Sequence, residues 1–364
     1  MKIAFSARRP VHPFAMGGAE LSMHVLFNHL ARLDHSCMLC GELTDDPRID
    51  GSPWRTAAEE GSIVMHDDRW PNRMAWSTSD GVQVTVTGTS GFERFITEEL
   101  DRFAPDHVLT HLDGALETLL WAQMRKTEST FFVRDIVNPY NWIPFTTPWI
   151  EPGQIRVVSN SRFVQQHLQS CWEVSSAVLY PPIERPRHRP RKEPPKKPVI
   201  AFVNPAPSKG GVLVHDLALR VPEFDFQVVE GWVSLEEVTW DWPPNVKLIR
   251  KRPSLDDVFA AASAVIVPSQ EPEAFCRVVP EAQARSTPVL ASAHTGLVEA
   301  LGDGGILIEE YQNVAAWEHM LCVLHNDKDV YRQCMDRGWD NAARFDADLL
   351  SRQFLRQIEE GLEP

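Results

Sequence analysis

The sequence predicts an α/β protein made of two similar halves, each with a parallel sheet covered on both faces by helices. Short apolar runs typical of buried strands alternate with segments of helical spacing along most of the chain. A proline-rich stretch interrupts this alternation once, near the middle. The length of the chain is consistent with two halves, because 364 residues correspond to two domains at roughly 150 residues each. With 43% hydrophobic residues, both halves can bury a core.

The first half opens with a buried strand at 3–5, followed by a loop with paired glycines and a helix from Ala19 to about Leu33. In this helix, Leu21, Val25 and Leu26 fall at helical spacing and give it one apolar face. The same alternation predicts further strands at 36–40, 107–111, 131–133 and 156–159, and helices at 91–103, 114–124 and 161–171.

Residues 181–198 separate the halves, because seven prolines and seven Lys or Arg in this stretch exclude a helix or an inner strand. An extended, solvated linker is the favoured interpretation, and a basic patch for phosphate is the alternative. The predicted domains are therefore 1–180 and 199–345, with a final helical segment at 346–364.

The second half repeats the scheme of the first. It opens with the apolar strand 199–203 and the loop NPAPSKGG, and it ends in a helical tail from 329 to about 362, with a break near 345–346. Between them the pattern predicts strands at 226–230, 246–249, 264–267 and 288–291, and helices at 212–219, 255–262, 279–284 and 297–301.

Composition excludes several classes of protein. A formal net charge of −14 argues against a sequence-independent nucleic-acid binder, which needs a basic face. No run approaches the ~18 apolar residues of a membrane-spanning helix, and Arg8 and Arg9 interrupt what would be the core of a signal peptide. Six cysteines are too few for a disulfide scaffold in this length, so we expect a reduced, cytoplasmic protein.

Two carboxylates flank the start of the predicted helix at 279–284. Glu273 lies in the preceding loop and Glu281 lies on the helix, with the free amides of 275–278 between them. Amides at a helix start bind anions, and a nucleotide-sugar offers hydroxyls on both sides of its diphosphate. The alternative is two surface glutamates on an ordinary helix.

Two glycine-bearing loops could add to such a site. Lys209 precedes Gly210 at the start of a helix, which brings a cation and exposed amides together. Gly17 and Gly18 likewise open a helix after the first strand and allow close backbone approach. Neither loop has the GxxxxGK[ST] or GxGxxG order, which argues against a P-loop enzyme and a dinucleotide-dependent oxidoreductase.

Together these motifs resemble the glycosyltransferase family 4 enzymes. The stretch VIVPSQEPEAFCRVVPEAQARSTPVLASAHTGLVEALGDGGILIE is similar to the family signature of Pro-Ser, two glutamates separated by seven residues, Thr-Pro-Val and Gly-x-x-Glu. The GGAE at 17–20 and the Lys-Gly at 209–210 agree with the family as well. The similarity extends in order from residue 1 to about 310.

The resemblance implies the GT-B fold, in which two Rossmann-like domains with parallel sheets face each other across a cleft and the last helix packs back on the N-terminal domain. It implies that Glu273 holds donor-sugar hydroxyls, Glu281 the ribose and Lys209 the diphosphate, with Gly18 lining the cleft. It also implies retention of anomeric configuration, no protein nucleophile, no metal and no cofactor besides the nucleotide-diphosphate sugar donor. The expected donor-binding residues are Gly17, Gly18, Asn204, Lys209, Gly210, Arg252, Glu273, Ala274, Phe275, Cys276, Arg277, Val278 and Glu281.

This chain departs from the family at three places. Asn204-Pro205 replaces a Gly-Arg pair, so we expect Arg277 or Arg252 to supply the missing phosphate cation. Cys276 stands where glycine is common. Arg134 and Asp135 occupy the place of a histidine that contacts the donor sugar in relatives, with His111 as a nearby candidate for acceptor contact or a hydrogen-bonded structural histidine. We expect these last three, with Lys209 and Glu273, to form the catalytic set.

The resulting prediction is a metal-independent, retaining glycosyltransferase acting on a saccharide, lipid-linked or small-molecule acceptor. The departures leave a catalytically weak or inactive nucleotide-sugar-binding protein as the alternative, and a GT-B sugar-nucleotide epimerase as a third. The aromatic run at 139–150 allows an acceptor site or peripheral contact with the inner membrane face, although packing of the loop on its own domain is the default. Cys37 and Cys40, without a second pair, and two Asp-x-Asp matches in the helical tail are poor metal sites.

Overall fold

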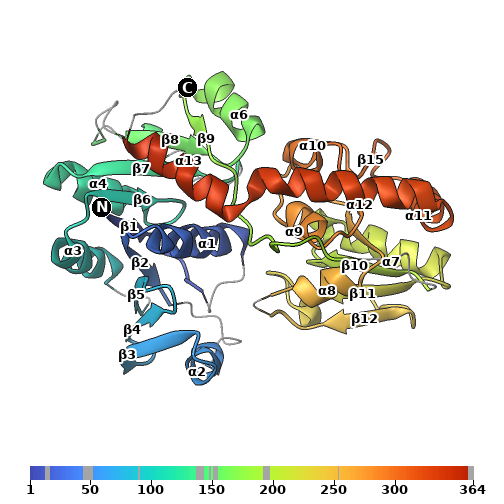
Figure 1. Ribbon diagram of the computed structural model, residues 1–364, viewed down its shortest axis with the longest axis horizontal. Helices are drawn as coiled ribbons and strands as arrows, with labels where there is room; N and C mark the ends of the chain where they lie inside the picture. Colours follow the sequence, from blue (N-terminus) through green and yellow to red (C-terminus); the bar gives the residue numbers. More distant parts are fainter. Residues whose placement is uncertain are drawn as a thin grey trace. The chain divides into compact units, whose positions relative to one another are not determined.

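The computed structural model describes residues 1–12, 17–43, 52–88, 91–136, 143–146, 149–150, 155–191, 197–252 and 254–359 (Figure 1). It divides into two compact units. The N-terminal unit comprises Met1–Pro182 together with Ala347–Pro364, and the C-terminal unit comprises Ile183–Asp346.

A nine-stranded sheet forms the centre of the N-terminal unit, in the order β3-β4-β5-β2-β1-β6-β7-β8-β9. Its middle strands are parallel and fully buried, which explains their continuous apolar sequence. Phe5 of β1, for example, is in register with Leu39 of β2 and Leu109 of β6. The strands span Lys2–Ser6 (β1), Ser36–Glu42 (β2), Ile63–Arg69 (β3), Arg73–Thr78 (β4), Gln83–Thr87 (β5), His107–Thr110 (β6), Glu128–Val133 (β7), Ile155–Ser159 (β8) and Ala177–Val178 (β9).

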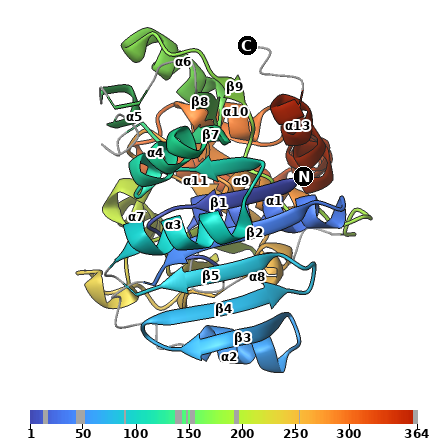
Figure 2. The ribbon, with the colours of Figure 1, turned by 90° about the vertical axis from the view of Figure 1, so that its left-hand side faces the viewer.

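One edge of this sheet is antiparallel, an arrangement that was not predicted from the sequence. Strand β4 runs antiparallel to both β3 and β5 (Figure 2). The outermost strand β3 begins with three apolar residues and continues with the polar run His66, Asp67, Asp68 and Arg69, and only its first residue is buried. Such a strand lacks the continuous apolar sequence that predicts a central strand.

Helices cover the sheet of the N-terminal unit, and the final helix of the chain is one of them. Helix α13 packs on α1, where the ring nitrogen Nδ1 of His29 lies 2.9 Å from a carboxylate oxygen of Asp348. Arg156 of β8 donates to the carbonyl oxygens of Gln357 and Ile358 near the end of α13. The helices span Gly18–Arg32 (α1), Ser52–Glu59 (α2), Phe92–Phe103 (α3), Ala115–Arg125 (α4), Ile143–Thr146 (α5), Arg162–Trp172 (α6) and Ala347–Glu359 (α13).

The C-terminal unit has a six-stranded sheet in the order β12-β11-β10-β13-β14-β15, and every pairing in it is parallel. The strands span Val199–Val203 (β10), Asp225–Val229 (β11), Val246–Ile249 (β12), Ala264–Val267 (β13), Val289–Ser292 (β14) and Ile306–Ile308 (β15). The helices span Gly211–Arg220 (α7), Asp256–Ala261 (α8), Val278–Ala284 (α9), Gly296–Leu301 (α10), Val314–Asn326 (α11) and Lys328–Ala342 (α12), with 3-10 turns at Pro207–Lys209 (η2), Leu235–Glu237 (η3) and Ala343–Phe345 (η4).

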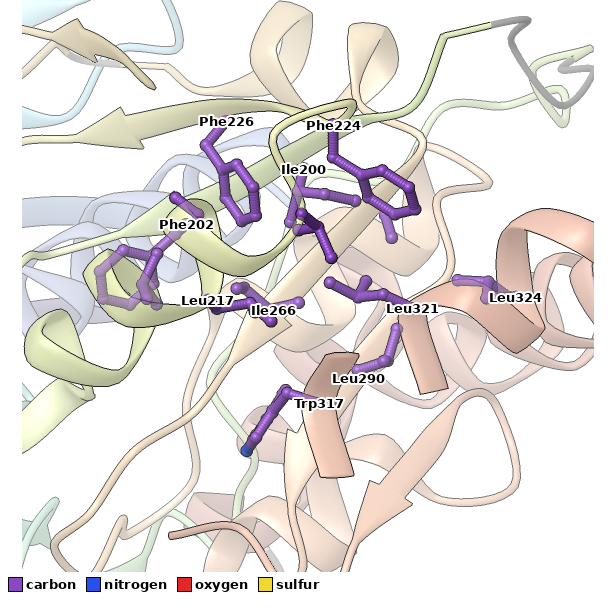
Figure 3. Packing of buried hydrophobic residues seen from close by; sticks show 14 of the residues in the cluster. Ile200, Phe202, Leu217, Phe224, Phe226, Ile266, Leu290, Trp317, Leu321 and Leu324 are labelled. Atoms are coloured by element: carbon purple, nitrogen blue, oxygen red, sulfur yellow. The ribbon is translucent and has the colours of Figure 1, made fainter. Parts of the chain in front are cut away.

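Helices α7 and α11 pack against each other over one face of this sheet and close its core. Trp317 of α11 is fully buried in an apolar cluster that also contains residues of β10, β11, β13 and β14 (Figure 3). Its indole donates to the carbonyl oxygen of Tyr311. Replacing such a tryptophan by alanine costs about 3–5 kcal/mol in a packed core. The core therefore fixes β10 and β13, the two strands that lead into the predicted donor loops.

The strand and helix predictions of the second half are confirmed to within one or two residues at most ends, but helix α11 and strand β15 were not predicted. The break in the helical tail is confirmed, because α12 ends at Ala342 and η4 precedes α13. The described part of the connector has no helix, and two of its arginines pack on α12: the Arg185 guanidinium lies 3.7 Å from the Trp339 ring centroid, and Arg189 pairs with Asp336. Within the described ranges, we find no helix with the length and apolarity needed to span a membrane.

Candidate functional site

The centre of the candidate site is an ion pair between Lys209 and Glu273. Lys209 ends the turn η2 after β10, and Glu273 lies in the loop after the neighbouring strand β13. The Lys209 ammonium donates to Oε1 of Glu273, and the Ser269 hydroxyl donates to the same oxygen at 2.7 Å. The side chains retain 22% and 12% of their exposure. The structure thus joins two predicted residues that lie 64 positions apart in the chain, at the carboxyl edge of a parallel sheet, where ligands bind in such folds.

Backbone contacts hold the two loops of this pair together. Gly210 has a φ of +91°, and a Cβ atom there would lie 2.2 Å from the carbonyl oxygen of Pro268. The amide of Gln270 donates to the carbonyl oxygen of Ser208 at 2.8 Å. Glycine is therefore required at 210 both for its backbone conformation and for this close approach.

A third loop, between β14 and α10, holds the backbone of Glu273 in place, a role that was not predicted from the sequence. The Glu273 amide donates to Oγ1 of Thr295 at 2.9 Å, and the Gly296 amide donates to the Glu273 carbonyl oxygen at 2.9 Å. Thr295 has a φ of +50°, which is a strained conformation for a β-branched residue. A Cβ atom on Gly296 would lie 2.2 Å from the carbonyl oxygen of Ala274. The Gly-x-x-Glu motif, which begins at Gly296, was the sequence signal from which this role could have been predicted.

Glu281 lies in the first turn of α9 and is paired with Arg277. The Arg277 guanidinium donates to Oε1 of Glu281 from Nε at 2.9 Å and from Nη2 at 2.7 Å. Arg277 is therefore engaged with the carboxylate expected to bind ribose. The other candidate cation, Arg252, pairs with Asp257 and donates to the carbonyl oxygen of Ser254.

The side chains between the two glutamates are buried or half-buried, so these residues can offer a ligand mainly their backbone groups. Phe275 is buried, and its ring packs edge-on against Phe345 with centroids 5.1 Å apart, so its side chain belongs to the core. Ala274 is buried as well, and Val278 begins α9. Cys276 has a φ of +77°, the left-handed region that favours glycine. Burial, with a contribution from the Glu273 carboxylate, raises the pKa of the Cys276 thiol to about 12, so the thiol is neutral at physiological pH.

Asn204 shapes the loop after β10. Its φ of +71° turns the chain out of the strand, its amide donates to the Val229 carbonyl oxygen at 2.8 Å, and its side chain is buried against Gly231. Asparagine tolerates this left-handed conformation better than most residues. The geometry of the loop is thus sufficient to explain why asparagine occupies position 204.

The two glycines predicted from GGAE lie in the N-terminal unit, at the start of α1. Gly17 precedes the helix, and a Cβ atom there would lie 2.3 Å from a carboxylate oxygen of Glu20. Glu20 is buried and pairs with Arg9 at 2.8 Å, and Arg9 also reaches Asp113 at 3.3 Å. In this conformation the motif's glutamate anchors the loop after β1.

His111 and Arg134 follow the adjacent strands β6 and β7 and are both buried. His111 is 0% exposed, and neither ring nitrogen has a hydrogen-bond partner among the residues that the structure describes. Burial, together with the charges of Arg134 and Arg9, holds the pKa of His111 well below its ordinary 6.5. The Arg134 guanidinium lies 4.0 Å from the ring centroid of Phe132, and Asp135 beside it is half-buried. Contact of His111 with an acceptor would require the side chain to be uncovered.

The cysteines and the Asp327 carboxylate that were considered as metal ligands are explained by burial and by helix capping. Cys37 and Cys40 are free, buried thiols on β2, and burial raises the pKa of each to about 12. Asp327 caps the start of α12 by accepting from the amides of Asp329 and Val330. In the described ranges, no three or more His, Cys, Asp or Glu side chains are grouped as a metal site would need.

Part of the C-terminal unit is similar to a known family. Residues 241–338 match the family described as Glycosyl transferases group 1. A 106-residue stretch is 37% identical to the D-inositol 3-phosphate glycosyltransferase of Corynebacterium kroppenstedtii, and the match covers 28% of this chain and 23% of that protein. The chain thus matches about a quarter of the length of this curated relative.

Solved structures match along almost the whole chain. A glycosyltransferase from Rickettsia africae superimposes with a TM-score of 0.71 at 17% identity, over 99% of this chain and 98% of that one. Anabaena HepE in complex with UDP and glucose superimposes with a TM-score of 0.73 at 16% identity, over 99% and 100%. The fold is therefore that of the GT-B glycosyltransferases, with two Rossmann-like halves, and within it residues 241–338 are similar to the Glycosyl transferases group 1 family.

Proposed function

We propose that this protein is a retaining, metal-independent glycosyltransferase of family 4 that uses a nucleoside-diphosphate sugar. The observation that carries the proposal is the Lys209–Glu273 pair, built from two loops at the carboxyl edge of the sheet and partly open to solvent. The group 1 domain at 241–338 includes Glu273 and Glu281. The UDP and glucose bound to the structural neighbour HepE are consistent with this class of donor.

In the proposed reaction the protein positions the donor and stabilises the leaving group. Lys209 has three N–H donors, so it can keep its bond to Glu273 and still donate to a departing diphosphate oxygen. Oε1 of Glu273 accepts from Lys209 and Ser269, which leaves Oε2 to accept hydroxyls of the donor sugar. Glu281, oriented by Arg277, binds the ribose hydroxyls.

The bond changes need no protein nucleophile. The acceptor oxygen bonds to the anomeric carbon on the face from which the phosphate oxygen departs, so the configuration is retained. The hydroxyl proton passes to the leaving phosphate oxygen, and the products are a glycoside and a nucleoside diphosphate. The role of Lys209 is then to neutralise the negative charge that develops on the diphosphate, which is the role that a metal ion fills in other transferases.

The acceptor belongs to the N-terminal unit in this proposal, at the ends of β6 and β7 where Asp113, Arg134 and Asp135 lie. We propose an uncharged or weakly charged hydroxyl acceptor, a saccharide, lipid-linked or small molecule, because Arg9, a cation near this edge, is balanced by Glu20 and Asp113. Half of the aromatic run at 139–150, proposed as an acceptor or membrane contact, lies outside the described residues.

Binding and turnover with a panel of UDP, GDP, ADP, TDP and their sugars tests this proposal. At about 100 times its dissociation constant, the matching nucleotide should raise the free energy of unfolding by ~2.7 kcal/mol. A transferase also hydrolyses its donor slowly and speeds up with acceptor. Stabilisation without any turnover would favour the nucleotide-sugar-binding alternative, turnover without acceptor into an isomeric sugar nucleotide would favour an epimerase, and no stabilisation by any nucleotide would contradict the donor site itself.

A further inference from the structure

An exposed tryptophan lies beside the Lys209–Glu273 pair and is not explained by packing. Trp232, in the loop after β11, is 60% exposed, although a tryptophan side chain normally buries 150–250 Å² in a core or interface. The ammonium of Lys209 lies over its ring, 4.9 Å from the centroid. One face of the indole is thus directed at the cation of the proposed diphosphate site.

The loop that carries Trp232 is fixed at both ends. Glu230 is buried and accepts from the Leu235 amide at 3.1 Å and from the Lys251 amide at 3.0 Å, which ties this loop to the one after β12. Ser234 and Glu237 form a capping box at the start of η3. Holding an aromatic ring in water on a preorganised loop is unfavourable for folding alone, but it lowers the entropy lost when a ligand packs on the ring.

The order of strands places Trp232 on the side of Lys209 opposite to Glu273. The sheet order β11-β10-β13 puts Trp232, Lys209 and Glu273 on three successive loops, with Lys209 in the middle. With the diphosphate on Lys209, the sugar toward Glu273 and the ribose on Glu281, the group of the donor left to contact the loop after β11 is the base.

We propose that Trp232 is a binding residue that stacks on the base of the donor nucleotide. This inference rests on the proposed function and adds a specific aromatic contact to it. Stacking on an indole depends little on base identity, because every base has a planar π face. Trp232 would therefore supply affinity, and the loops around Lys251 and Arg252 would be left to discriminate between bases.

The test compares three probes on wild type, Trp232→Ala and Trp232→Phe by calorimetry: the tightest-binding of UDP, GDP, ADP and TDP, the corresponding nucleotide-sugar, and inorganic pyrophosphate. In Trp232→Ala, we expect the nucleotide and the nucleotide-sugar to weaken equally, by about 10-fold, and pyrophosphate to change by less than about 2-fold. Trp232→Phe should restore most of the affinity. Leu219→Ala, which removes a 58%-exposed side chain from α7, is the matched control and should change none of the three.

Other outcomes overturn the inference. Loss confined to the nucleotide-sugar would mean that Trp232 packs on the sugar, and equal loss of pyrophosphate would mean that it acts only through Lys209. Unchanged binding of all three probes would remove Trp232 from the site. A wild-type protein that binds no nucleotide would overturn the proposed function as well, so the two failures are distinguishable.

Discussion

The carboxyl edges of the two sheets both carry ionisable side chains, but these side chains differ in their exposure to solvent. In the C-terminal unit, Lys209 and Glu273 meet across neighbouring loops and keep part of their side chains in solvent. In the N-terminal unit, His111 and Arg134 follow neighbouring strands in the same way but are buried. The comparison shows that strand topology brings polar residues together, whereas the loops decide whether a ligand can reach them. This difference supports our proposal that the donor binds at the first edge, and it means that at the second edge, proposed for the acceptor, His111 and Arg134 support the site from within the core.

The largest expected effect is on nucleotide affinity and comes from removing Lys209, the cation at the carboxyl edge of the sheet in the C-terminal unit. Lys209→Ala should weaken nucleoside-diphosphate binding by roughly 2–5 kcal/mol, because Glu273 then loses its partner and the diphosphate its counter-charge. Calorimetry with the tightest-binding nucleotide measures this. Lys247→Ala, which removes the same charge from an exposed position on β12, is the matched control and should leave binding within about 2-fold. Equal effects of the two substitutions would mean that Lys209 acts only through net charge.

Acid should distinguish the two units. Burial lowers the pKa of His12 to about 4 and that of His107 to about 3, and both lie in the N-terminal unit with His111. Because these values lie below the unfolded value of about 6.5, the unfolded chain takes up protons that the folded unit does not. The stabilisation is complete above about pH 7 and is lost as the pH falls from 6.5 toward 4, by up to about 3 kcal/mol for His12 alone.

Hydrogen exchange at pH 7.5 and pH 5 measures this difference. The amides of β1 and β6 should lose more protection than those of β10 and β13, and His12→Gln should reduce the loss. Equal loss in both units would show that the buried histidines do not control the acid sensitivity of the N-terminal unit.

Gly296→Ala tests whether the loop after β14 positions Glu273. The added methyl group would lie 2.2 Å from the Ala274 carbonyl oxygen, so the Glu273 loop must shift, at a cost of about 1–3 kcal/mol. We expect transfer to fall much more than nucleotide binding. Gly81→Ala is the control, because its added methyl group meets nothing within 4 Å, whereas its φ of +88° makes alanine unfavourable there for the backbone and so destabilises the other unit. If Gly81→Ala reduced transfer as strongly, lost stability alone would explain both variants.

The smallest effect is expected at Cys276. Cys276→Gly relieves a left-handed backbone conformation and should stabilise the C-terminal unit by up to about 1 kcal/mol, partly offset by the greater freedom of glycine in the unfolded chain. Thermal unfolding with donor absent measures this. A clear loss of stability would instead show that packing of the buried thiol outweighs the strain.

The same contrast separates what the sequence could predict from what it could not. Strand β13 was predicted because its four residues form one apolar run, and all four are buried. Strand β3 was not predicted because its second half, from His66 to Arg69, is polar and mostly exposed. The expected parts of the donor site came from motifs that resemble known enzymes, and topology then joins Lys209 to Glu273. The positive φ of Thr295 and the exposure of Trp232 depend on contacts between distant loops, which no local pattern encodes.

The most direct measurement is a pair of affinities, for one nucleoside diphosphate and for the corresponding nucleotide-sugar, in wild type and in Glu273→Gln. Glutamine retains an oxygen that can accept from Lys209 and Ser269 but loses the charge and one acceptor oxygen. We predict that Glu273→Gln binds the diphosphate within about 3-fold of wild type, loses any additional affinity due to the sugar, and transfers no sugar, while Glu223→Gln behaves as wild type. A parallel loss of both affinities would contradict the separation of sugar and diphosphate between Glu273 and Lys209.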